Sequence, residues 1–168
     1  MSVPFLTPLA AALLHVPPPE RAVVLNSGDG EAALLLAREF PAARVRGVDA
    51  RSELVRQASA RVGLDPEGRV VFKVGRPGAL PYPDGFFDLA VQIDGRPAAG
   101  EVSRILQPGG HFVLARSSEP GFGSSVRRAL LERWLARRGL AIERAESSGD
   151  GNFLVARLRA GERSRAPD

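Results

Sequence analysis

Residues 80–91 read LPYPDGFFDLAV, and residues 101–112 read EVSRILQPGGHF. In the first stretch, two prolines and a glycine indicate a turn, and the apolar run after it indicates a buried strand. In the second stretch, a helical pattern stops at Pro108, Gly109 and Gly110, and another apolar run follows. Together the two stretches predict strand, helix and strand, with the two strands parallel.

The same alternation extends to both sides. Short apolar runs predict strands at 22–25, 45–49, 70–74, 87–93 and 111–116, and helical patterns predict helices at 31–40, 52–62, 98–106 and 124–138. Two further apolar runs, 141–146 and 153–158, are joined by a Ser-Ser-Gly-Asp-Gly-Asn turn, which favours an antiparallel hairpin. We therefore expect an α/β fold, Rossmann-like and doubly wound, with a mostly parallel seven-stranded sheet and an antiparallel C-terminal hairpin.

A length of 168 residues suits one such domain. Residues 4–15 predict a short amphipathic helix, and Pro17, Pro18 and Pro19 an extended linker. The expected organisation is an N-terminal helix and linker over 1–19, one domain over 20–159 and a flexible polar tail over 160–168.

The composition excludes several classes of protein. With no cysteine and two histidines, disulfides, thiolate metal sites and histidine-rich metal centres are excluded, so we expect no metal. The apolar runs are too short to span a bilayer, and a signal peptide is not recognisable at the N-terminus. A cytoplasmic location is the default expectation.

The formal charge of +4 raises the question of nucleic-acid binding. The densest basic stretch, residues 127–144, lies on the last predicted helix and just beyond it, and contains Glu132 and Glu143 among its arginines. This mixture favours a solvated helix face over an RNA-binding strip, although the strip stays open.

The turn after the first strand indicates a nucleotide site. Gly28 and Gly30 stand directly before a helix, where glycine lets a ligand approach the backbone and the helix N-terminus favours polar groups. Asp49 ends the second strand about twenty residues later, where a carboxylate accepts the hydroxyls of a ribose. The alternative is a tight turn that simply needs glycine. Gly28-x-Gly30-x-x-Ala33 also fits a dinucleotide fingerprint, so NAD stays a competitor at this point.

The stretches 80–91 and 101–112 resemble the "LPFPDGSFDLV" and "EIxRVLKPGGxF" blocks of class I S-adenosylmethionine-dependent methyltransferases. The similarity runs from about residue 23 to residue 158, and the pattern is most similar to the small-molecule enzymes of ubiquinone and menaquinone biosynthesis. The resemblance implies a methyltransferase with S-adenosylmethionine as cofactor and a small-molecule acceptor, although the acceptor and the oligomeric state do not follow from it.

The resemblance also implies roles for single residues. The family's LDxGxGxG block aligns with residues 25–32, which places Ser27 and Gly28 beside the methionine part of the cofactor. The other cofactor-binding positions implied are Asn26, Gly30, Asp49 for the ribose, Ala50 against the adenine, and Gly75 and Arg76 in the adenine loop.

The sequence departs from the family pattern at three positions. Asn26 replaces an aspartate, Ala32 a glycine, and Arg76 the acid that reads the adenine amino group. Arginine has no hydrogen-bond acceptor, so that group must find another partner. These departures favour a second reading, a catalytically impaired methyltransferase-like scaffold or regulatory domain. A third interpretation is an NAD-binding oxidoreductase, but the sequence contains no recognisable Tyr-x-x-x-Lys pair to support it.

Methyl transfer needs no obligatory catalytic side chain, since the cofactor carries the electrophile. Asp94, just after the fourth predicted strand, is a candidate general base or substrate contact, and equally a cap for the turn at Gly95. His15 is a weaker candidate, because the N-terminal segment covers the cofactor in relatives. His111 is expected at the start of the fifth strand, at the edge opposite the site, with a structural role.

Overall fold

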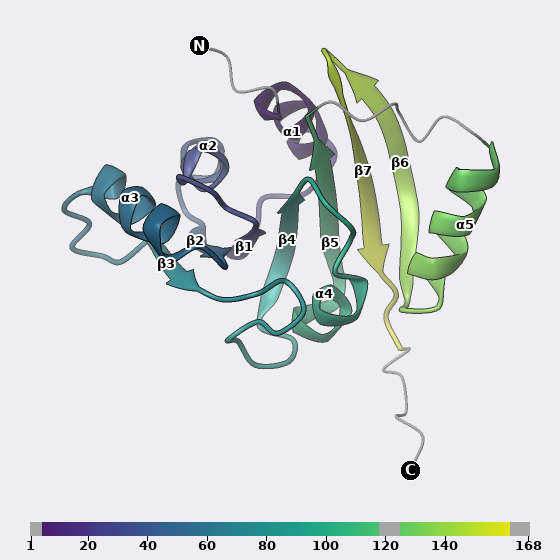
Figure 1. Cartoon of the computed structure of the whole chain (residues 1–168). Helices are drawn as coiled ribbons and strands as arrows, with labels where there is room; N and C mark the ends of the chain where they lie inside the picture. Colours follow the sequence, from purple (N-terminus) through teal and green to yellow (C-terminus); the bar gives the residue numbers. More distant parts are fainter. Residues whose placement is uncertain (1–4, 118–124, 162–168) are drawn as a thin grey trace.

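A seven-stranded sheet forms the centre of the described part of the chain, residues 5–117 and 125–161 of this computed structural model (Figure 1). Its strands are β1 (Arg21–Leu25), β2 (Arg44–Asp49), β3 (Val70–Val74), β4 (Phe87–Ile93), β5 (Leu106–Arg116), β6 (Leu140–Ser148) and β7 (Gly151–Leu158). The strand order is β3-β2-β1-β4-β5-β7-β6. Neighbours from β3 to β5 are parallel, and β7 is antiparallel to both β5 and β6. The expected sheet and C-terminal hairpin are thus confirmed.

Two layers of helices cover the sheet (Figure 1). The helices are α1 (Leu6–Leu13), α2 (Glu31–Glu39), α3 (Ser52–Val62), α4 (Ala99–Ile105) and α5 (Ser125–Ala136). One hydrophobic core packs α1, α2 and α3 against the sheet, and a second packs α4 and α5 against the other face. This is the doubly wound arrangement that right-handed parallel crossovers produce.

The boundary between α4 and β5 differs from the prediction. The helix ends at Ile105, and β5 begins at Leu106, five residues before the expected start. Leu106 already has extended dihedrals, and the pairing of β4 with β5 shifts register so that Phe87 faces Leu106 while Leu89 faces His111. The Pro-Gly-Gly segment therefore lies inside the strand as an irregularity, where Gly109 adopts a φ of 83°.

Helix α1 is part of the core. Leu9 and Ala12 are fully buried, and the helix packs on β5 and β7. After the prolines, the backbone N–H groups of Glu20 and Arg21 donate to the carboxylate of Asp88, which ties the linker to β4. The separate N-terminal unit over 1–19 stays a prediction, and most of the expected tail lies outside the described residues. Every helix within residues 5–117 and 125–161 is too short or too polar to cross a membrane.

Candidate cofactor site

The glycine turn between β1 and α2 lies at the carboxyl edge of the sheet. Gly28 and Gly30 both have positive φ, 56° and 96°. A Cβ on Gly30 would lie 3.0 Å from the ring of Phe72 and 3.1 Å from the Cβ of Ala58, so tight packing adds to the preference of this dihedral for glycine. A Cβ on Gly28 would meet no atom of the described residues within 4 Å. The side of Gly28 is therefore open, as a backbone approached by a ligand must be.

Asp49 ends β2 beside this turn and is 2 % exposed. Its Oδ2 accepts the backbone N–H of Gly28 at 2.9 Å, and its Oδ1 accepts the backbone N–H of Arg51 at 2.9 Å. The side chain of Arg51 adds one donor to each oxygen, Nε to Oδ1 at 2.9 Å and Nη2 to Oδ2 at 3.0 Å. Burial raises the pKa of Asp49, but the bonds from Arg51 and Gly28 outweigh it and hold the pKa below its usual value. The carboxylate is therefore ionised and fully engaged.

Asn26 joins the ends of two strands. It has a φ of 55°, and its Nδ2 donates to the carbonyl of Ile93, the last residue of β4, at 3.1 Å. An aspartate has no donor for this carbonyl. The departure from the family pattern at this position therefore has a structural reason.

The remaining predicted cofactor residues lie around the same edge. Ser27 is buried, and its Oγ has no hydrogen-bond partner among residues 5–117 and 125–161. This oxygen lies 3.1 Å from the point where a Cβ on Gly47 would stand. Gly75 donates its N–H to the carbonyl of Asp49, while Ala50 and Arg76 are exposed. The turn that Arg76 starts is closed by a bond from the N–H of Ala79 to its carbonyl.

The two candidate catalytic residues have other contacts. Asp94, at a φ of 52°, accepts the N–H of Ser117 at 2.9 Å and its hydroxyl at 3.0 Å, so its carboxylate ties the end of β5 to the end of β4. His15 is exposed, and its ring stacks on Phe153 with centroids 5.9 Å apart. A catalytic role for either stays a prediction.

His111 lies within β5 and not at its start, because the strand begins at Leu106. Its Nε2 is 3.5 Å from the carboxylate of Glu143. Burial lowers the pKa of His111, and the nearby Glu143 opposes this only in part. These contacts agree with the structural role expected for it.

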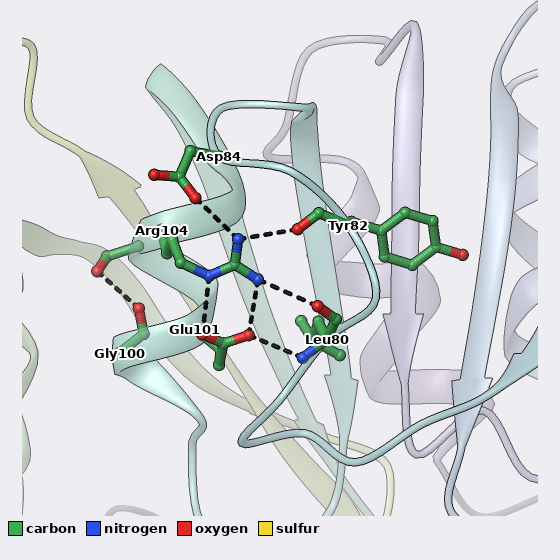
Figure 2. Close-up of polar contacts among 7 residues, drawn as sticks. Leu80, Tyr82, Asp84, Gly100, Glu101 and Arg104 are labelled. Atoms are coloured by element: carbon green, nitrogen blue, oxygen red, sulfur yellow. Dashed lines mark hydrogen bonds and ion pairs between the residues drawn. The ribbon is translucent and has the colours of Figure 1, made fainter.

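A cluster centred on Arg104 joins the two stretches that identified the fold (Figure 2). Its guanidinium donates twice to Glu101, once to Asp84, and to the carbonyls of Leu80 and Tyr82. The carboxylate of Glu101 also accepts the N–H of Leu80 at 2.8 Å. Both stretches are therefore structural, since they hold the loop before β4 against α4 at the amino edge of the sheet, opposite Asp49.

The basic stretch over 127–144 is divided between ion pairs and a cavity. Arg128 pairs with Glu132 at 2.9 Å, as expected of a solvated helix face. A cavity of about 520 Å³ lies between α5 and the segment after β4, and its lining residues are Arg96, Pro97, Leu130, Leu131, Arg133, Trp134 and Arg137. The guanidinium of Arg96 covers the Trp134 ring, 5.5 Å from its centroid.

The carboxyl edge fits an adenosine cofactor on one condition. Gly28 leaves open space, and Asp49 is a buried, ionised carboxylate oriented by two backbone N–H groups. Ribose hydroxyls need the acceptor positions that Arg51 holds, so they reach Asp49 only when that side chain moves aside. Among the described residues, no three histidine, cysteine, aspartate or glutamate side chains lie together as the ligands of a metal ion would.

Fold and site together define a class I S-adenosylmethionine-dependent methyltransferase architecture. Residues 25–114, more than half of the chain, match the methyltransferase domain family. The chain belongs to this family.

Relatives with curated names agree with the resemblance in sequence. A demethylmenaquinone methyltransferase of Thermus thermophilus is 37% identical over 118 residues, which cover 63% of this chain and 51% of the relative. A ubiquinone/menaquinone biosynthesis C-methyltransferase of Geobacter sulfurreducens is 29% identical over 60% of this chain and 43% of its own length. The chain thus spans about half the length of these relatives.

Solved structures share the fold. A methyltransferase from Aquifex aeolicus, described as SAM dependent, superposes with a TM-score of 0.74 at 15% identity and covers 91% of this chain and 90% of its own. A chain from the complex of the Haloferax volcanii Trm112 methyltransferase activator with a methyltransferase gives 0.78 at 20% identity, covering 94% and 91%. At these identities the likeness shows the fold alone.

Two features of the site were missing from the sequence interpretation. The pairing of Arg51 with Asp49 had a local signal, since an arginine two residues after a carboxylate lies within its reach. The bond from Asn26 to Ile93 had none, because its partners are 67 positions apart.

Proposed function

We propose that this chain is an S-adenosylmethionine-dependent methyltransferase domain that acts on a small-molecule acceptor. The observation that carries the proposal is Asp49, which is buried, ionised and oriented by backbone donors beside the open side of Gly28. The cofactor, when bound, supplies the electrophilic methyl group. Asp49 would hold the ribose, and the turn from Asn26 to Gly30 would hold the methionine part.

The acceptor class is suggested by the names of the relatives, which refer to demethylmenaquinone and to ubiquinone and menaquinone biosynthesis. A quinone-type ring is therefore the first acceptor to test. The cavity beside α5 is a candidate place for it, because its Arg96 follows Asp94 by two residues. A cytoplasmic location belongs to the same proposal.

Calorimetric titration of the purified chain tests the cofactor. We expect S-adenosylmethionine and S-adenosylhomocysteine to bind in the micromolar range and NAD not to bind. If neither sulfur cofactor produced heat at millimolar concentration, the proposal that this chain is a methyltransferase would be contradicted. This result would favour the scaffold reading, which the engagement of Asp49 by Arg51 supports.

Arg76→Asp tests the placement of the adenine. The substitution restores an acceptor for the adenine amino group, worth about 1 kcal/mol or roughly fivefold in affinity. Arg159→Asp makes the same charge change at an exposed residue just after β7, and we expect it to leave the affinity unchanged. An unchanged affinity in Arg76→Asp, with the wild type binding, would move the adenine elsewhere.

A further inference from the structure

The side chain of Arg51 covers the outer side of the Asp49 carboxylate. Each oxygen already holds one backbone donor, Gly28 N on Oδ2 and Arg51 N on Oδ1, both at 2.9 Å. The remaining acceptor position on each oxygen holds one nitrogen of the guanidinium, Nη2 and Nε respectively. The carboxylate is 3% exposed, so a ligand arriving from solvent meets the guanidinium first.

The arrangement of the two nitrogens matches that of a vicinal diol. The guanidinium carries its two donors on one carbon and the diol carries its two hydroxyls on adjacent carbons, but each presents two donors side by side, and a carboxylate accepts either pair as a two-bonded fork. Arg51 and a ribose would therefore use the same two acceptor positions, and they exclude each other.

Arg51 is free to leave these positions. The Arg51 side chain is 65% exposed. All the hydrogen bonds and ion pairs that this side chain makes with the described residues go to Asp49. It stands directly before α3, with extended dihedrals. Rotamer changes of exposed side chains take picoseconds to nanoseconds, so the exchange does not limit binding. After it, Asp49 keeps both backbone donors.

We propose that Arg51 is a gate that imitates the ribose diol, so that it competes with the cofactor for Asp49 and sets its affinity. The inference rests on the proposed function, since it concerns the same site. It names the chemical feature that opens the gate, a vicinal diol, and predicts that nucleosides without one do not gain from removing Arg51.

Titration with S-adenosylhomocysteine tests the gate, because this ligand lacks the sulfonium charge that a nearby arginine would repel. The Arg51 side chain is mostly exposed, so its pair with the buried Asp49 is worth about 1 kcal/mol, and Arg51→Ala is expected to tighten binding about fivefold. Arg51→Lys, with a single ammonium that cannot form the fork, should fall between the two. Arg128→Ala removes an exposed ion pair on α5 and should leave the affinity unchanged.

The 2′,3′-dideoxy analogue of S-adenosylhomocysteine separates competition for Asp49 from a general charge effect. We expect its affinity to be the same in the wild type and in Arg51→Ala. An equal gain for both ligands would overturn the diol competition.

The remaining outcomes separate the gate from the function. If wild type and Arg51→Ala bind S-adenosylhomocysteine equally well, the gate is wrong and the methyltransferase proposal stands. If neither binds, both are wrong. Binding by Arg51→Ala alone would support the gate and show that the wild-type site is closed.

Discussion

Two arginine–carboxylate forks lie at opposite edges of the same sheet. At the amino edge, Arg104 binds Glu101, Asp84 and two loop carbonyls, and its side chain is 31% exposed. At the carboxyl edge, the Arg51 side chain binds Asp49 alone within the described part of the chain and is 65% exposed. The chemistry of the two pairs is the same, but the number of partners differs. Arg104 joins separate segments of the chain, whereas Arg51 only covers a carboxylate.

A bidentate arginine–carboxylate pair is therefore not structural in itself. Removing Arg104 takes a donor from three groups at once, the Glu101 carboxylate and the carbonyls of Leu80 and Tyr82, whereas removing Arg51 takes donors from Asp49, which keeps its two backbone donors. A group left unsatisfied costs far more than the net value of the bond it lost. The four changes below, in order of decreasing effect, test this contrast through the free energy of unfolding.

Arg104→Ala should have the largest effect. It leaves the half-buried Glu101 without its cation and frees the loop before β4 from α4, and we expect a loss of about 2–3 kcal/mol. Urea unfolding followed by circular dichroism measures it. Arg128→Ala, which removes an exposed pair within one helix, is the control and should cost less than about 0.5 kcal/mol. A similar small loss for both variants would mean that the Arg104 cluster does not hold the loop.

Glu101→Gln should cost about 1–2 kcal/mol at neutral pH, since the amide keeps one acceptor and loses the charge. The hydrogen bonds from Arg104 lower the pKa of Glu101. The charge therefore stabilises the fold fully above the unfolded pKa of about 4.3, and this contribution is lost as the pH falls through the lower folded value. The difference between wild type and variant should stay constant from pH 7 to pH 5 and shrink below pH 4. If the stability difference between wild type and Glu101→Gln stayed constant down to pH 3, the charge of Glu101 would not be what stabilises the fold.

Asn26→Asp should cost about 1 kcal/mol, although it restores the family residue. The new carboxylate cannot donate to the carbonyl of Ile93 and places two acceptors against each other. Asn26→Gly, which loses the same bond but relaxes a φ of 55°, should cost less. Thermal unfolding of both variants checks the order, and greater stability of the aspartate would remove the structural reason for Asn26.

Arg51→Ala should change stability least, by no more than about 1 kcal/mol, which is the free energy that the pairing of Arg51 with Asp49 takes from ligand binding. The same urea experiment measures it. A loss above 1.5 kcal/mol would show that Arg51 holds the fold as Arg104 does, and the contrast between the two edges would disappear.

Much of the fold was predictable because its signals are local. The predicted bounds of α3, β3 and β4 match the observed ones, since apolar periodicity and flanking turn residues mark them. The start of β5 was missed because Pro108, Gly109 and Gly110 usually end an element, and only the pairing with β4 shows them inside a strand.

The grouping of the candidate cofactor residues at one edge of the sheet was predictable, but their contacts were not. Strand ends located the turn at Gly28 and Asp49 on one edge. Whether a ligand can reach the Asp49 carboxylate depends on the position of the Arg51 side chain. Whether Asn26 has a structural role depends on its hydrogen bond to the carbonyl of Ile93, which is distant in the sequence. Such contacts follow from tertiary packing and leave no pattern of their own in the sequence.

The stacking of Arg96 on Trp134 provides an optical reporter. Trp134 is the only tryptophan of the chain, and the cation above its ring belongs to the segment that follows β4, two residues beyond Asp94. Any ligand that displaces this segment changes the charge and the solvent next to the indole. The intrinsic fluorescence of the unlabelled protein therefore reports events at one border of the site, without a probe that would itself occupy it.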